Sequence, residues 1–148
     1  ATANLVALCE ALVTSQQAGM DLATAYEAIR ISSGNSFVHE TESQVILNGS
    51  RDINFTMDLV LKDVSLFQAL ADRSGIPLEI SPILLEVFGD AARRFGPREW
   101  SPNVIRRLEE ATGRRGEAPG FPGEMVDTEP KRPGHEVKPR TEMGPRSE

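Results

Sequence analysis

The segment from Asn54 to Gly75 constrains the fold most, because it is the longest amphipathic stretch of the chain. Its apolar residues recur every three or four positions, which is the period of an α-helix. Two neighbouring stripes of this kind give a wide apolar face, which suits a helix packed on several sides. One stripe also contains an acidic residue, and an ionised carboxylate in an apolar row is costly unless it is paired or lines a hydrated cleft. The members of that stripe are Leu59, Asp63, Leu66 and Leu70.

Helical patterns also fill most of the chain on either side of this segment, and no convincing strand pattern is present. Asp21 is a good N-cap for a helix, and Ser81-Pro82 and Ser101-Pro102 each combine a cap with a proline suited to a first turn. The first helix has no capping residue and looks already under way before Ala1. We therefore predict an all-α fold whose six helices span about residues 1–18, 22–31, 36–47, 57–74, 82–95 and 102–112.

The composition changes after residue 112. Residues 113–148 contain six of the ten prolines and six of the twelve glycines, with few large apolar side chains. Such a segment buries too little surface to offset the entropy of ordering it. We therefore expect a helical domain over residues 1–112 and a tail over residues 113–148. The tail's cluster at 119–126 is a candidate for an extended docked arm, and disorder is expected beyond about residue 128.

Charge and cysteine content restrict the partners and the compartment. The net charge of −6 argues against nucleic acid and anionic membranes as partners, and no apolar run is long enough to span a bilayer. The single cysteine, Cys9, lies on an apolar helical row, which indicates a buried thiol in a reducing, cytoplasmic setting. The only histidines, His39 and His135, are far apart in the sequence, so no metal site is expected.

The central segment resembles part of a known enzyme family. Phe55 precedes Lys62-Asp63 by seven residues of mostly apolar character, and the helix that follows ends at Gly75-Ile76-Pro77-Leu78. This pattern is similar to the C-terminal domain of the β-hydroxyacid dehydrogenases, the group of 3-hydroxyisobutyrate dehydrogenase, tartronate semialdehyde reductase and glyoxylate reductase. The resemblance covers roughly residues 5 to 112. It implies a helical substrate and dimerisation domain, like the C-terminal domain of 6-phosphogluconate dehydrogenase.

The resemblance also implies roles for three residues. The family's matching lysine lies beside the nicotinamide cofactor, which assigns Lys62 to binding NAD or NADP. The matching phenylalanine and aspartate border the substrate cleft, which assigns Phe55 and Asp63 to binding the substrate. The residues by themselves leave a simpler alternative open: Lys62 pairs with Asp58 one helical turn earlier, and Asp63 serves as a partner between helices.

Two other features are weaker candidates. The polar turn at 32–36 has the composition of an ordinary helix breaker followed by an N-cap, although a similar turn falls near the cleft in the family. Trp100 precedes the Ser101-Pro102 start signal and is expected to pack as a hydrophobic anchor.

Two absences define what this chain lacks as an enzyme. It has no glycine-rich dinucleotide-binding motif after a strand, and Lys62 is its first lysine. The family's catalytic lysine is expected upstream of Ala1, so no catalytic residue is assigned here. The resemblance thus implies that this chain is part of an NAD(P)-dependent oxidoreductase for small 3-hydroxy or 2-hydroxy acids. The enzyme is expected to be a homo-oligomer. The chain is expected to be active when joined to its own N-terminal Rossmann domain and inactive alone. The alternative is a non-enzymatic helical interaction or dimerisation module.

Overall fold

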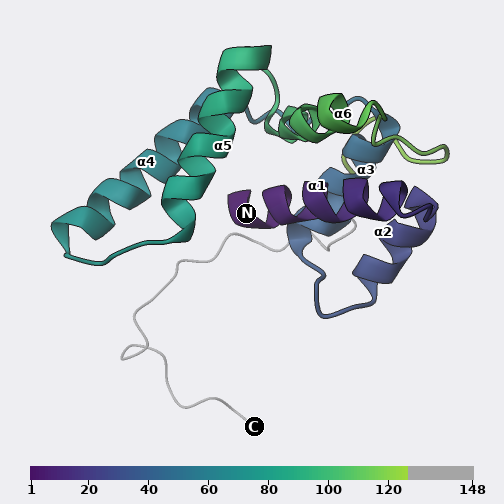
Figure 1. The fold of residues 1–148 in the computed structure, drawn as a ribbon, viewed down its shortest axis with the longest axis horizontal. Coiled ribbons are helices and arrows are strands. Elements are labelled where there is room, and N and C mark those ends of the chain that lie inside the picture. The colour runs from purple at the N-terminus through teal and green to yellow at the C-terminus, as the bar shows by residue number, and fades with distance from the viewer. Residues whose placement is uncertain (127–148) are drawn as a thin grey trace, which may run out of the picture.

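The computed structural model describes residues 1–126, which form an all-α fold as predicted (Figure 1). Within these residues the only β-type pairing is an isolated bridge between Thr56 and Trp100, so no strand is present there. The elements are α1 (Thr2–Gln17), α2 (Leu22–Arg30), α3 (Phe37–Asn48), α4 (Met57–Arg73), α5 (Ile80–Phe95), the 3₁₀ helix η1 (Ser101–Ile105) and α6 (Arg106–Thr112).

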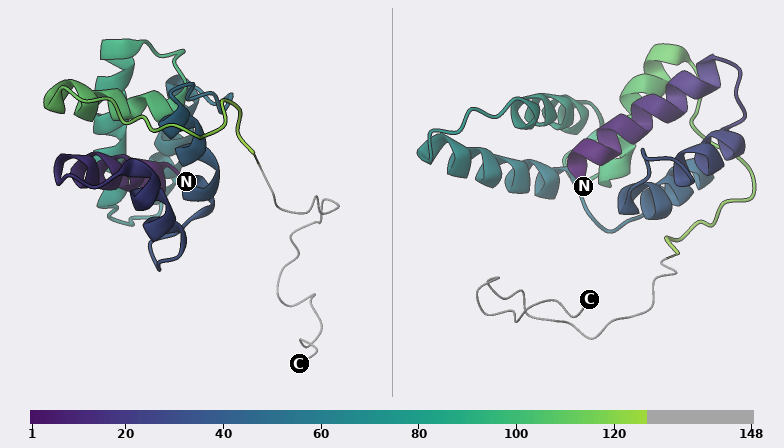
Figure 2. Two further views of the ribbon diagram at one scale, coloured as in Figure 1. Left: turned by 90° about the vertical axis from the view of Figure 1, so that its right-hand side faces the viewer. Right: turned by 90° about the horizontal axis from the view of Figure 1, so that it is seen from below.

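Helix α1 is the centre of the arrangement. It contacts α2, α3, α5, η1 and α6, whereas α4 packs chiefly against α5. The antiparallel α4–α5 pair projects to one side of the other helices, and the start of α1 lies beside the start of α5 (Figures 1 and 2). The core between these elements is apolar, and its largest fully buried hydrophobic side chains are Phe88, Leu12, Ile46, Leu47, Met57 and Ile105.

Local capping signals place most of the helix ends. Asp21 accepts a hydrogen bond from the Thr24 N–H at 2.9 Å and so starts α2. Ser36 accepts one from the His39 N–H at 3.1 Å and starts α3 in the same way. Gly49 ends α3 in the left-handed region at φ 92°, where a residue without Cβ is favoured.

The start of α5 differs from the prediction. The helix begins at Ile80 with Glu79 as its cap, so Ser81 is a buried residue inside the first turn rather than the cap. Pro82 then occupies the third helical position, which is tolerated because the first N–H groups of a helix have no partner within the helix. The expected cap at Ser81 was therefore wrong by two residues.

The wide apolar face of α4 is not packed on several sides within the described residues. Met57, Val60 and Ala71 are its buried residues. Three large apolar side chains on its C-terminal half remain more than half exposed, at 63%, 59% and 54% for Leu66, Phe67 and Leu70. They belong to the projecting hairpin, which explains why no other helix within residues 1–126 covers them.

Residues 114–126 form an extended arm along α3, as suggested for the cluster at 119–126. The ring of Phe121 meets Tyr26 edge-on at 5.1 Å between centroids. The expected disorder beyond residue 128 lies outside the described residues. Hydrogen bonds to the arm run from the Ala118 N–H to the Leu47 carbonyl (2.8 Å), from Asn48 Nδ2 to the Phe121 carbonyl (2.8 Å) and from Ser50 Oγ to the Gly123 carbonyl (2.6 Å).

A buried ion pair anchors the start of this arm. Arg51 donates from one guanidinium nitrogen to Glu109 Oε1 at 2.6 Å and from another to Asn103 Oδ1 at 3.3 Å. The same Glu109 oxygen accepts the Gly116 N–H at 2.7 Å. Since Arg51 and Glu109 are both buried, this pair joins the connector after α3, helix α6 and the arm.

Candidate functional site

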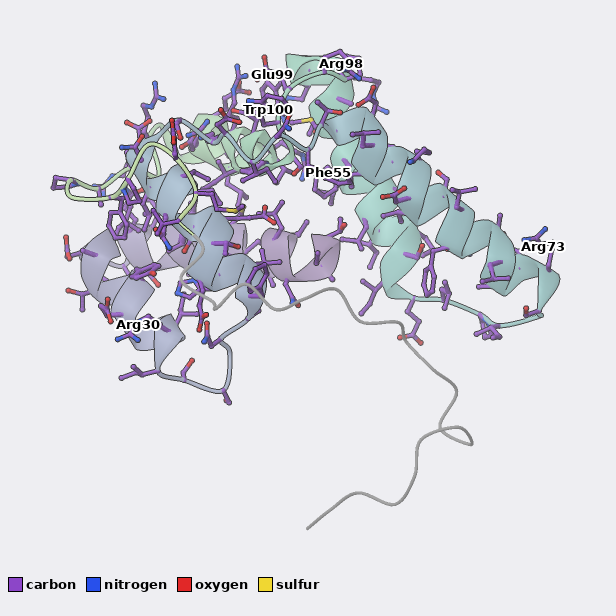
Figure 3. All side chains as sticks on the ribbon, turned by 180° about the vertical axis from the view of Figure 1, so that it is seen from behind. Arg30, Phe55, Arg73, Arg98, Glu99 and Trp100 are labelled. Atoms are coloured by element: carbon purple, nitrogen blue, oxygen red, sulfur yellow. The ribbon has the colours of Figure 1, made fainter. Side chains whose placement is uncertain are left out.

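The connector that holds Phe55 is joined to the segment before η1. The Ser101 N–H donates to the Phe55 carbonyl at 2.8 Å, and the Met57 N–H donates to the Glu99 carbonyl at 2.9 Å. Figure 3 shows Phe55 on the same side as Trp100 and Glu99, near the base of the hairpin. Phe55 is half-buried and packs against the core. Its position is therefore fixed by backbone pairing on one side and apolar packing on the other.

Lys62 and Asp63 lie on α4 and pair with each other. Lys62 Nζ is 3.0 Å from an Asp63 carboxylate oxygen, and their side chains are 59% and 54% exposed. An ion pair with this exposure contributes little to stability, about 0–1 kcal/mol. Both charged groups therefore remain accessible to a ligand without a large energetic cost.

The alternative pair between Lys62 and Asp58 is not formed. Asp58 accepts the Leu59 N–H at 2.9 Å and the Thr56 hydroxyl, and it pairs with Arg98 at 3.0 Å. These interactions lower the pKa of the Asp58 carboxyl, and the hydrogen bonds from Thr56 and Arg98 contribute most. Asp58 is thus committed to the start of α4, which leaves Lys62 free to pair elsewhere.

Asp63 lines a hollow of about 650 Å³ between the start of α1 and the half of the hairpin that contains the α4–α5 loop. Most of the exposed lining is apolar and comes from four places: the start of α1, the middle of α4, the loop at 77–79 and the start of α5. Neither Phe55 nor Lys62 lines this hollow, so the structure gathers only one of the three predicted residues there. The lining residues other than Asp63 include Ala1, Ala3, Val64, Phe67, Ile80 and Leu84.

A second hollow, of about 430 Å³, lies between α1 and the polar turn at 32–36. His39 also lines it, and burial lowers the pKa of this imidazole despite a bond to the Tyr26 carbonyl. The turn is therefore more than a helix breaker, because it forms one wall of a hollow. Cys9, by contrast, is a buried thiol whose pKa is raised by burial.

Glu42 is a residue that the sequence analysis missed. Its Oε2 is buried without a hydrogen-bond partner among the described residues, and burial raises the pKa of the carboxyl to about 7, with the Ala1 amine acting in the opposite direction. A signal was present: Val38, Glu42 and Val45 are spaced four and three apart, so a carboxylate interrupts an apolar row as it does at Asp63. The polar residues mixed through α3 obscured this pattern.

Other kinds of site were sought in the same residues. Across residues 1–126, no group of three or more His, Cys, Asp and Glu side chains is arranged to hold a metal ion. No helix in that part of the chain is long and apolar enough to cross a membrane.

Comparison with known proteins agrees with the resemblance drawn from the sequence. Residues 1–108 match the family described as the NAD-binding domain of NADP-dependent 3-hydroxyisobutyrate dehydrogenase. L-Threonate dehydrogenases from two strains of Escherichia coli, K12 and CFT073, are each 24% identical over 103 residues, which cover 70% of this chain and 34% of theirs. The chain thus spans about a third of the length of these curated relatives.

A solved structure shows the same fold. The crystal structure of 3-hydroxyisobutyrate dehydrogenase from Salmonella typhimurium superimposes with a TM-score of 0.65 at 25% identity, covering 72% of this chain and 37% of that one. The resemblance inferred from Phe55, Lys62 and Asp63 is confirmed at the level of the family and the fold, whereas the roles of the three residues stay predictions.

Proposed function

The chain belongs to the family of the NAD-binding domain of NADP-dependent 3-hydroxyisobutyrate dehydrogenase, and we propose that it forms part of an oxidoreductase acting on a small hydroxy acid. In this proposal a hydride passes between a nicotinamide cofactor and the carbon that bears the substrate hydroxyl. The observation that carries it is the match over residues 1–108, which includes the whole hairpin and the Asp63 hollow. A cytoplasmic location remains part of the same proposal.

The proposed contribution of this chain is one wall of the substrate cleft. Asp63 offers an exposed carboxylate at a largely apolar hollow, where it can accept a hydrogen bond from a substrate hydroxyl. Phe55 is proposed to border the same cleft from the connector before α4, outside the lining of this hollow. The hollow also includes Ala1 and Ala3, so it would lie close to the upstream domain that we propose as the source of the catalytic lysine.

The described residues fit one charged contact to NAD or NADP rather than a complete cofactor site. Lys62 has an exposed ammonium with a single exposed partner, Asp63, so it can bind a phosphate or carboxamide oxygen. The chain has no glycine-rich loop at a helix start to present N–H groups to a pyrophosphate. We propose that an N-terminal Rossmann domain supplies those contacts and that the isolated chain is inactive.

The proposal that another domain binds the cofactor and supplies the catalytic lysine is tested with the isolated chain. Calorimetric titration of the 148-residue chain with NADH and NADPH should show no binding tighter than about 1 mM, and hydride-transfer assays with short 3-hydroxy and 2-hydroxy acids should show no turnover. Tight binding or turnover by the isolated chain would contradict the assignment of these tasks to another domain.

The role of Asp63 is tested in the enzyme that includes the dinucleotide-binding domain. Asp63→Ala should lower kcat/KM by about 100-fold while changing the melting temperature by only a few degrees, because the side chain is exposed. Asp72→Asn on the same helix, where the carboxylate bonds only Gln68, is the matched control and should leave kinetics unchanged. Equal kinetics for Asp63→Ala and wild type would remove Asp63 from the site.

The exposed apolar residues of the hairpin support a homo-oligomer as the working form. Leu66 and Leu70 on α4 are more than half exposed among the described residues and line none of the hollows described above, and exposed apolar surface of this kind marks interaction sites. The same observation favours the alternative function, a non-enzymatic dimerisation module. The two differ in kinetics: Leu70→Glu should shift the sedimentation of both toward monomer, but only the enzyme has a hydride-transfer activity to measure.

A further inference from the structure

The hollow between α1 and the turn at 32–36 is separate from the one that Asp63 lines. The two share no lining residue, and the second is the more enclosed of the two in shape. Its volume of about 430 Å³ falls within the range of small-molecule sites, about 300–1,000 Å³. One wall is the small-residue face of α1, at Asn4, Ala7 and Ala11, and the opposite wall is the serine-rich turn.

The chemistry of this hollow centres on His39, whose residue surface is only 1% exposed. Its Nε2 lies 2.9 Å from the Tyr26 carbonyl oxygen, which can only accept, so Nε2 carries the proton and donates. Burial favours the neutral ring, and in the neutral ring Nδ1 is then an acceptor. Nδ1 has no donor among the described residues, and a buried acceptor left unpaired costs free energy.

The turn adds hydroxyl groups without adding charge. Ser36 Oγ accepts the His39 N–H at 3.1 Å, and its own hydrogen remains available. Ser33 is exposed at the same wall. Asn35 is already satisfied, because its amide donates to Glu40 and its oxygen accepts the Ser36 N–H. Within residues 1–126, no Lys, Arg, Asp or Glu side chain lines the hollow.

We propose that this hollow binds a neutral polyhydroxylated molecule of polyol to monosaccharide size, with one ligand hydroxyl donating to His39 Nδ1. Hydroxyl groups both donate and accept, so they match an unpaired imidazole nitrogen on one wall and serine hydroxyls on the other. The faces of Ala7, Ala11 and Ile29 provide apolar contact for the carbon skeleton. The result is a binding site apart from the proposed hydroxy-acid cleft.

The absence of a lining cation distinguishes this ligand from the proposed substrate. A hydroxy acid carries a carboxylate, which is expensive to desolvate without a positive partner. The charged groups around His39, namely Glu27, Arg30 and Glu40, act on its ring from outside the lining. A neutral ligand avoids that desolvation cost.

The test follows the side-chain nitrogens of His39 by NMR in the whole 148-residue chain labelled with ¹⁵N-histidine. Titration with glycerol, ribose and glucose, each to about 100 mM, should give saturable binding of at least one of them with Kd of about 1–10 mM. The Nδ1 resonance should move toward that of a hydrogen-bonded nitrogen, while Nε2 stays nearly fixed. Resonances of His39 that do not move with any of the three would overturn the proposal.

Two variants sharpen the result. Ala7→Leu adds bulk to the hollow from α1 with a strong helix former and removes none of the polar groups, so it should weaken binding at least tenfold. Ala28→Leu makes the same change at an exposed position of α2 outside the hollow and should bind like wild type. Unchanged binding in Ala7→Leu would place the ligand elsewhere.

An anionic probe separates this site from the proposed function. Glycerate has the hydroxyls of glycerol plus a carboxylate, and it should bind at least fivefold more weakly than the best neutral probe. If glycerate binds as tightly and moves the same Nδ1 resonance, the hollow belongs to the hydroxy-acid site and the neutral-ligand proposal is wrong. The proposed function can fail independently: if Asp63→Ala leaves catalysis unchanged, the expected results of these titrations stay the same.

Discussion

Replacing Glu42 with glutamine should make the fold less sensitive to pH. The carboxyl pKa rises from its ordinary value of 4.5 to about 7 because the side chain is half-buried on α3, where Oε2 is removed from water and has no hydrogen-bond partner among residues 1–126. The folded chain therefore keeps a proton that the unfolded chain releases as pH rises above 4.5. The free energy of unfolding must then fall as pH increases from about 4.5 to 7, and the loss persists above 7.

The size of the effect follows from that difference in pKa. At about 1.36 kcal/mol per pKa unit, the full cost is about 3 kcal/mol, and partial access of water reduces it, so we expect about 1–3 kcal/mol. Glu42→Gln removes the titrating group while keeping its shape. We compare the free energy of unfolding of the variant with that of wild type at each pH. This difference should be about 1–3 kcal/mol more favourable to the variant at pH 8 than at pH 4.5.

The assay is urea unfolding of wild type and variant between pH 4 and 8. The difference between the two proteins isolates Glu42, because His39 and the other titrating groups are common to both. Glu86→Gln, at an exposed position of α5, is the control and should show a flat difference across the range. A Glu42→Gln difference equally flat from pH 4.5 to 8 would show that the carboxyl reaches solvent and would refute the reasoning.

Two further predictions concern the C-terminal part of the chain. Arg51→Met should lower the free energy of unfolding by about 3–5 kcal/mol, because it leaves Glu109 buried without its positive partner, and the double change with Glu109→Leu should recover part of this loss in urea unfolding. Deleting residues from about 128 onward should change the free energy of unfolding by less than about 0.5 kcal/mol, since their composition offers little apolar surface to bury. A larger loss in calorimetry would show that they pack on the domain.

Sequence reasoning succeeded where one residue decides the local structure. Asp21 was predicted as a cap because its carboxylate accepts a backbone N–H within one turn, and the structure has that bond. Glycines at the ends of α3 and α6 stop those helices in the left-handed region, as expected for a residue without Cβ. These interactions span three or four residues, so the sequence contains all that is needed to predict them.

Prediction from the sequence failed where tertiary contacts overrode a local signal. Ser81-Pro82 has the composition of a helix start, yet α5 begins two residues before that cap position would allow, and Ser81 is buried. Likewise, the spacing of Asp58 and Lys62 favours an ion pair between them, but Arg98, forty residues further on, takes Asp58 instead. The partner that decided the outcome was distant in the sequence in the second case, so no local spacing rule contained it.

The candidate site shows the same division more sharply. The row Leu59, Asp63, Leu66 and Leu70 correctly located a carboxylate at a hollow, because periodicity reports which residues share a face. It did not report what covers that face. Leu66 and Leu70 are exposed on the projecting hairpin, so no part of residues 1–126 buries this half of the apolar stripe. An amphipathic pattern states that burial is favourable and leaves open whether the same chain, another domain or a second copy provides it. For this chain, the exposed stripe of α4 is therefore the surface that the proposed oligomer would cover, and Leu70→Glu should weaken self-association without unfolding the domain.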